Sequence, residues 1–167
     1  KYLPSNDCSE YICATANKNG YVITVDSSSE TPYVIDCNSD HTEYYDAEGK
    51  LVKIKDHQGF ETLLSYTATL ITITDTVSGK KIYLEKDTSG KVVRVYDDAS
   101  REAILTYNID GTLKSIKDVN GKTMSFSYDE YGQILTGTDS ENIRYFTNEY
   151  DAFGRVINQK DAIEGSR

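Results

Sequence analysis

The sequence has no tryptophan, one methionine and only two prolines, Pro4 and Pro32, among its 167 residues. Proline interrupts the hydrogen-bond ladder of a sheet, so the chain beyond Pro32 can form paired strands without a break. No apolar run approaches the length of a membrane span, and we therefore expect no membrane insertion. No window shows a sustained 3.6-residue apolar period with caps, so we expect no helices.

Basic residues are also scarce. The chain has 18 Lys and Arg against 27 Asp and Glu, a formal net charge of −9. Nucleic acids and anionic membrane surfaces bind basic patches, so this charge argues against both as partners. The chain begins at Lys1, shows no signal peptide and ends in Gly165-Ser166-Arg167. From these ends we expect a piece of a longer protein.

Cysteine occurs three times, always in the first quarter of the chain: Cys8, Cys13 and Cys37. Cys8 and Cys13 are spaced to form a disulfide across a tight loop if the protein is exported, and the odd number leaves at least one thiol over. The alternative is that all three are small, partly buried residues of strands. No CxxC motif or Cys/His cluster accompanies them, so we expect neither a zinc site nor a cofactor.

Tyrosine is the abundant aromatic residue, with 14 copies against 4 phenylalanines, and it marks a repeat. In five segments a glycine is followed by an apolar residue two places on and by an aspartate seven places on. These segments are Gly49-Leu51-Asp56, Gly90-Val92-Asp97, Gly111-Leu113-Asp118, Gly132-Ile134-Asp139 and Gly154-Val156-Asp161. Four of the glycines also follow a tyrosine by four residues: Tyr45, Tyr107, Tyr128 and Tyr150. Fixed spacing of this kind is typical of stacked repeats.

Each repeat divides into two halves of strand length. The second half alternates apolar and polar residues, as in Met124, Phe126 and Tyr128, which predicts a strand with one buried face. In the first half the apolar residues are three apart, as in Leu113 and Ile116. This spacing breaks the alternation and predicts either a bulge or a strand covered on both faces.

Turn residues separate the halves. Asn120-Gly121 is a dipeptide that tolerates positive φ, and Ser100 and Asn142 stand where a glycine is expected. We predict an all-β fold, an antiparallel hairpin meander that forms a twisted, curved sheet. Residues 1–44 are interpreted as degenerate or entry strands, 45–162 as the repeat array and 163–167 as a tail. Residues 67–86 disturb the register, which we interpret as an insertion or a bulge and not as a domain boundary, with strands at 68–75 and 81–85.

Three tracts place Tyr-Asp four residues before the glycine: Tyr45-Asp46, Tyr128-Asp129 and Tyr150-Asp151. With the following apolar residue and a period of 21 or 22 residues, they resemble the YD repeat, also called the RHS repeat. The resemblance extends from about Tyr44 to Ala162. It departs from the pattern at Asn108, which replaces the aspartate, and in the unit around Gly90, which lacks Tyr-Asp.

The resemblance implies an antiparallel sheet that spirals into a hollow shell. In bacterial polymorphic toxins and toxin complexes such shells enclose a C-terminal toxic domain, and teneurins carry a similar shell in a cell-surface adhesion receptor. Repeats of this kind have also been linked to carbohydrate binding. The family's autoproteolytic segment has no counterpart here, because no DPxGxx-like stretch occurs. No catalytic residue is therefore carried over.

The recurring residues have a structural interpretation and a functional alternative. We interpret the aspartates as turn residues that bind local N–H groups, the alternative being a ladder of carboxylates for Ca²⁺. The tyrosines are interpreted as cross-strand packing residues, the alternative being a sugar-binding surface. The structural set is Tyr45, Gly49, Asp56, Tyr107, Gly111, Asp118, Tyr128, Gly132, Asp139, Tyr150, Gly154 and Asp161. Tyr66 is grouped with these tyrosines, whereas Tyr33, Tyr44, Tyr83 and Tyr131 are expected to be exposed.

Catalysis is not expected. The two histidines are His41, in a polar stretch, and His57, beside Asp56. Adjacent residues in a turn seldom form a catalytic triad, and the sequence contains no nucleophile motif or phosphate loop. We therefore predict a protein that is not an enzyme and that has no metal or cofactor site.

The sequence favours a structural role for this chain, as a segment of a secreted or bacterial cell-surface protein. The chain is expected to form part of a shell that encloses a C-terminal toxin or effector, with the rest of the parent chain and that domain as partners. Because such a segment exposes strand edges, we also expect self-association. The alternative is an adhesion module that binds glycans through exposed tyrosines.

Overall fold

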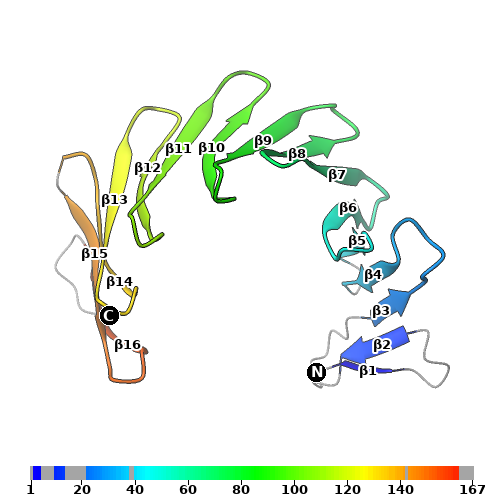
Figure 1. The fold of residues 1–167 in the computed structure, drawn as a ribbon, viewed down its shortest axis with the longest axis horizontal. Coiled ribbons are helices and arrows are strands. Elements are labelled where there is room, and N and C mark those ends of the chain that lie inside the picture. The colour runs from blue at the N-terminus through cyan, green and yellow to red at the C-terminus, as the bar shows by residue number, and fades with distance from the viewer. Residues whose placement is uncertain (1, 5–9, 14–21, 38–39, 142, 162–167) are drawn as a thin grey trace. The chain divides into compact units, whose positions relative to one another are not determined.

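The computed structural model describes residues 2–4, 10–13, 22–37, 40–141 and 143–161 (Figure 1). All regular structure in these residues is β, and each strand is followed in the sheet by the next strand of the sequence. The pairings are antiparallel. The prediction of an all-β antiparallel meander is confirmed. The chain divides into two units, Lys1–Tyr83 and Leu84–Arg167, which are described separately.

The described residues of the first unit form eight complete strands. They are β1 (Tyr2–Pro4), β2 (Glu10–Cys13), β3 (Val22–Val25), β4 (Tyr33–Asp36), β5 (His41–Tyr45), β6 (Leu51–Asp56), β7 (Glu61–Tyr66) and β8 (Leu70–Asp75). The boundary between the units falls within β9 (Lys81–Lys86). The strands predicted at 68–75 and 81–85 correspond to β8 and β9, whereas the division between the two units falls inside the segment 67–86, where the sequence predicts no boundary.

The second unit continues the meander. Its strands are β10 (Val92–Asp97), β11 (Glu102–Tyr107), β12 (Leu113–Lys117), β13 (Thr123–Tyr128), β14 (Ile134–Thr138), β15 (Arg144–Tyr150) and β16 (Val156–Asp161). The predicted tail at 163–167 lies outside the described residues. The predicted division at residue 44/45 lies between β5 residues and remains a prediction.

The three-residue spacing of the apolar positions reflects a bulge. Tyr107 is paired with Leu113, but the preceding Thr106 is paired with Ser115, so one residue of β12 has no partner. The same shift occurs where Tyr45, Tyr128 and Tyr150 are paired with the strand that follows each of them. The extra residue returns the apolar side chains at positions two and five after the glycine to one face of the sheet.

In residues 22–37, 40–141 and 143–161, neither unit has a conventional core. Pro32 and Gly137 are buried there, and Asn148 is the buried polar residue, at 6% exposure, but no Ala, Val, Ile, Leu, Met, Phe or Tyr side chain is buried. The apolar residues instead form half-buried cross-strand pairs such as Leu105 with Ile116 and Ile116 with Met124. Pairs of this kind stabilise a single layer of sheet but leave apolar surface in contact with water.

One glycine of the array serves packing. Gly137 occupies the position at which other repeats have Ile54, Val95 or Ile116, and it is paired with Phe126 on one side and Phe146 on the other. A Cβ at Gly137 would lie 2.9 Å from Cζ of Phe146 and closer still to its Cε1. The Phe146 ring therefore fills the space of the missing side chain, as aromatic residues do opposite strand glycines.

Candidate functional site

The recurring aspartates form the turns. At Asp118 the backbone carbonyl accepts a hydrogen bond from the Gly121 N–H at 3.0 Å, and one carboxylate oxygen accepts the N–H groups of Asn120 and Lys122 at 2.9 and 2.8 Å. The glycine has φ of +82°, which is the left-handed region. This arrangement is a type I turn with a glycine bulge, a common hairpin connection.

The same geometry recurs along the chain at both ends of the strands. One carboxylate oxygen accepts two turn N–H groups in Asp56, Asp87, Asp97, Asp118, Asp129, Asp139 and Asp151. These carboxylates are engaged by their own turns, which favours the structural interpretation over a calcium ladder. Asp161 ends β16, and no turn after it is described.

Hydrogen bonds stabilise the ionised form of three of these carboxylates, those of Asp87, Asp97 and Asp151. Arg101 donates to Asp97 and lowers the pKa of its carboxyl, with the N–H groups of Arg101 and Ala99 adding to the effect. The pKa of Asp151 is lowered by the backbone N–H and then the side chain of Arg155. The pKa of Asp87 is lowered mainly by the hydroxyl of Ser89.

The repeat tyrosines each close the open end of a hairpin. Tyr107 donates its hydroxyl proton to the carbonyl of Val92, 15 residues earlier, at 2.7 Å. The equivalent bonds run from Tyr66 to Leu51, from Tyr128 to Leu113 and from Tyr150 to Ile134, at 2.6, 2.8 and 2.8 Å. The acceptor is in every case the apolar residue that follows the turn glycine by two places. We call this contact the tyrosine latch.

Tyr45 is the exception to the latch. The residue 15 places earlier is Glu30, which is not part of a strand, and the Tyr45 hydroxyl donates instead to Oε2 of Glu43 at 2.7 Å. Glu43 stands two residues before the tyrosine, where the repeats of Tyr66, Tyr107 and Tyr128 have Leu64, Leu105 and Phe126 and the repeat of Tyr150 has Asn148. The carboxylate therefore occupies a position that is apolar in the middle of the array.

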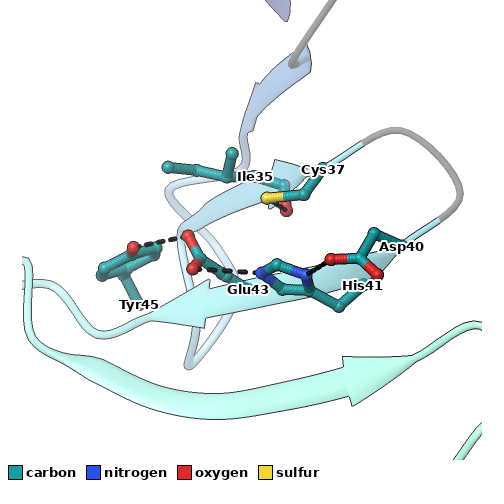
Figure 2. Close-up of polar contacts among 6 residues, drawn as sticks. All are labelled: Ile35, Cys37, Asp40, His41, Glu43 and Tyr45. Carbon is teal, nitrogen blue, oxygen red and sulfur yellow. Dashed lines mark hydrogen bonds and ion pairs between the residues drawn. The ribbon is translucent and has the colours of Figure 1, made fainter. Parts of the chain in front are cut away.

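This exception belongs to a polar cluster on the β4–β5 hairpin (Figure 2). Nδ1 of His41 lies 2.9 Å from Oδ2 of Asp40, and its Nε2 lies 3.3 Å from Oε1 of Glu43. Cys37 is a free thiol, and its backbone N–H donates to the carbonyl of His41 across the hairpin. One donor atom each from Cys37, His41 and Glu43 lie within 4.8 Å of one another.

The cluster has a negative electrostatic character. Hydrogen bonds to Asp40 and then Glu43 raise the pKa of His41. The pKa of Cys37 is also raised, first by burial and then by the charges of Glu43, Asp36 and Asp40. A cysteine nucleophile needs a lowered pKa, so these surroundings do not activate Cys37 for covalent catalysis.

The second histidine lies close to this cluster without forming a triad. His57 and Asp56 line a shallow pocket together with Asp36, His41 and Lys55. Oδ1 of Asp56 accepts the N–H groups of Gln58 and Phe60, so this carboxylate oxygen serves the turn. The predicted pairing of Cys8 with Cys13 falls outside the described residues, because Cys8 is not among them.

A second candidate site lies on the turns of the second unit. Tyr131 and Phe153 precede the glycines of two turns, are 79% and 83% exposed, and line one groove with Gln133, Tyr150 and Asp151. The Gln133 amide packs on the turn between β15 and β16, where a Cβ at Gly154 would lie 2.8 Å from its Nε2.

The expected exposure of the other tyrosines is correct for some and wrong for others. Tyr33 and Tyr131 are exposed. Tyr44 and Tyr83 are half-buried, and the ammonium group of Lys53 lies 4.1 Å from the centre of the Tyr44 ring. Tyr44 is paired with Val34 on one side and Lys53 on the other, so neighbouring strands cover it.

The Cys37–His41–Glu43 cluster is missed by sequence reasoning. Cys-x₃-His-x-Glu is not among the metal-binding motifs of known Cys/His spacing. The signal that was available is the polar Glu43 at an apolar repeat position, in a hairpin that also contains a cysteine and a histidine.

Comparison with known proteins gives no family. No family model and no curated protein matches this sequence. Among solved structures, a porin-like protein from Bacteroides uniformis is similar with a TM-score of 0.37 and 12% identity, over 93% of this chain and 91% of the other. A likeness at this level carries no argument about function. In the part of the chain that the structure describes, no helix has the length and apolarity needed to cross a membrane.

Proposed function

We propose that this chain is a structural, non-enzymatic segment of a secreted or cell-surface YD-repeat protein, and that it forms part of a wall around a C-terminal toxin or effector. One observation carries the proposal. The recurring tyrosines, glycines and aspartates of the array are used to close hairpins and turns. A motif whose side chains bind the backbone of the same chain in each copy builds a repeating scaffold.

The surface of the array is consistent with a wall. The half-buried row of apolar side chains that includes Leu105 and Ile116 keeps some contact with water. Val156 and Ile157 of β16 are exposed as well. Apolar surface of this extent favours a covering partner, and an enclosed domain of the same polypeptide would provide one.

The test uses the full polypeptide from which the chain derives. Sequencing the coding region on both sides should reveal further Tyr-Asp units and a C-terminal variable domain. In the purified full-length protein, that domain should resist limited proteolysis, and Leu105→Asp should expose it to cleavage. The matched variant Ile109→Asp changes a fully exposed turn residue and should leave the protection intact. Repeats that stop at this segment, or a domain cleaved equally in all three proteins, would count against a wall.

A second candidate function is glycan adhesion, which the Tyr131–Phe153 groove favours. Two exposed aromatic rings on neighbouring turns, with Gln133 and carboxylates between them, offer stacking faces and hydrogen-bonding groups. A glycan array followed by calorimetry should detect a ligand whose affinity falls on Tyr131→Ala or Phe153→Ala. Ile109→Ala removes an exposed apolar turn residue outside the groove and should bind as the unmodified chain does. Equal binding by all variants would exclude the groove.

A further inference from the structure

We propose that Cys37, His41 and Glu43 form a binding site for a divalent transition metal of the zinc class. The proposal is independent of the wall and adhesion functions, because it rests on the β4–β5 hairpin alone. A thiolate, an imidazole nitrogen and a carboxylate oxygen are the ligand types that zinc takes in proteins. The thiolate selects against magnesium and calcium, which prefer oxygen ligands.

The separations between the donor atoms fit this assignment. Ligands bound tetrahedrally to zinc at the usual bond lengths lie about 3.3 to 3.6 Å from each other. Nε2 of His41 and Oε1 of Glu43 are 3.3 Å apart, and the three donor atoms all lie within 4.8 Å of one another. A small rotation of the Cys37 side chain therefore completes three-ligand geometry, and the fourth position is left for water or another donor.

The residues around the ligands hold them in place, as the neighbours of metal ligands do. Asp40 contacts Nδ1 of His41, which fixes the ring and leaves Nε2 directed at Glu43 (Figure 2). A carboxylate on the far nitrogen is the usual partner of a metal-bound histidine. The Tyr45 hydroxyl holds Oε2 of Glu43 at 2.7 Å, so Oε1 is the oxygen that faces the histidine.

The local charge favours a dication. Asp36 and Asp40 place two further carboxylates on the hairpin that carries Glu43, and a bound dication would offset their negative charge. The dication would also deprotonate the thiol. The thiol proton, and any proton on Nε2 of His41, would pass to solvent as the sulfur and nitrogen lone pairs bind the metal.

The site also explains why the array departs from its pattern here. Glu43 replaces the apolar residue that stands two places before Tyr66, Tyr107 and Tyr128, and the Tyr45 hydroxyl donates to its carboxylate. A carboxylate among apolar neighbours costs stability unless it is paired. Pairing it with an ion would offset that cost at the start of the array.

Titration of the chain with Zn²⁺ by calorimetry, and with Co²⁺ by absorption spectroscopy, tests the site. We expect one ion per chain and a thiolate-to-cobalt charge-transfer band. Asp40→Asn should weaken binding about 10- to 100-fold, the usual cost of removing such a partner, and Cys37→Ser or His41→Gln should cost more. The matched control, Cys8→Ser with Cys13→Ser, removes the other two cysteines and should bind as the unmodified chain does.

A second measurement needs no variant and so does not depend on folding of a mutant. Zn²⁺ should slow alkylation of Cys37, read by mass spectrometry on the tryptic peptide 19–50, in which Cys37 is the only cysteine. Unchanged alkylation of Cys37, no charge-transfer band, or binding that survives Cys37→Ser but is lost in the Cys8/Cys13 variant would overturn the proposal.

Discussion

The β4–β5 hairpin and the hairpins of the second unit use the same tyrosine for different purposes. In β11, β13 and β15 the tyrosine hydroxyl bonds a carbonyl of the preceding strand, 15 or 16 residues earlier. In β5 the hydroxyl of Tyr45 bonds Glu43, a carboxylate beside His41. The repeat therefore fixes where the tyrosine lies in the sheet. Its hydrogen-bond acceptor, either a strand carbonyl or the Glu43 carboxylate, decides whether the tyrosine supports the backbone or orients a polar side chain.

Among the substitutions considered, an isoleucine at Gly137, where other repeats have an apolar side chain, should reduce stability most. Gly137→Ile forces a side chain into the space of the Phe146 ring and should lower the free energy of unfolding by about 1–3 kcal/mol, the usual cost of overpacking. Denaturant titration measures the loss. The double variant with Phe146→Ala should recover part of it, and a purely additive double variant would contradict this packing.

A substitution at Gly132 measures the stability cost of backbone strain without a packing contribution. A Cβ at Gly132 would meet nothing within 4 Å, but φ there is +78°. Gly132→Ala should therefore cost about 1–2 kcal/mol through backbone conformation alone. Denaturant titration checks the value, and a neutral substitution would show that the turn changes type.

Removing the hydroxyl from Tyr107 and from Tyr45 tests whether these two tyrosines have different roles. Tyr107→Phe deletes a latch to Val92 and should cost about 1 kcal/mol of stability, the typical net value of one hydrogen bond. Tyr45→Phe frees Oε2 of Glu43 and should shift the ¹⁵N resonances of His41 more than it changes unfolding. If Tyr107→Phe and Tyr45→Phe lost the same stability and the ¹⁵N resonances of His41 did not shift, the two tyrosines would have the same role.

Changes in pH should affect the two regions in opposite directions. The lowered pKa values of Asp97 and Asp151 mean that their contribution is complete above the ordinary value of 3.8 and is lost as the pH falls through the folded-state values. The raised pKa of His41 means that its contribution is complete below 6.5 and is lost as the pH rises through its folded-state value. Hydrogen exchange of the metal-free chain should show the aspartate turns opening first in acid and β4–β5 first in weak alkali. The same order at both extremes would contradict the assignment.

The smallest effect is a gain at the single non-glycine residue with positive φ among the described residues. Ser100 has φ of 61° where the other turns have glycine. Ser100→Gly relieves the left-handed conformation but increases the entropy of the unfolded chain, and the net gain should stay below about 1 kcal/mol. A change in the melting temperature reports it, and a loss would show that the Ser100 side chain contributes more than its backbone strain costs.

Much of the fold follows from local residues, which is why the sequence predicts it. The turn at Asp118 and the bulge between Leu113 and Ile116 are determined within a few positions of the chain. The latch acceptor at Val92 and the replacement of an apolar side chain by the Phe146 ring depend on strand register, which spacing alone does not give. The cluster of Cys37, His41 and Glu43 depends in the same way on the pairing of Cys37 with His41 across a hairpin.

The reach of the tyrosine latch has a consequence for how such a chain changes over generations. Tyr107 and Tyr128 each bond a carbonyl 15 residues earlier, within the same hairpin. A deletion of residues 108–128 would join Tyr107 to Asp129, leaving the hydroxyl contacts of Tyr107 and Tyr150 and the turn after Asp129 with their own partners. Duplication of the same stretch would add a hairpin equipped with its own contacts. Unequal recombination can therefore lengthen or shorten the array by whole units, each of which brings its own turn and tyrosine contact.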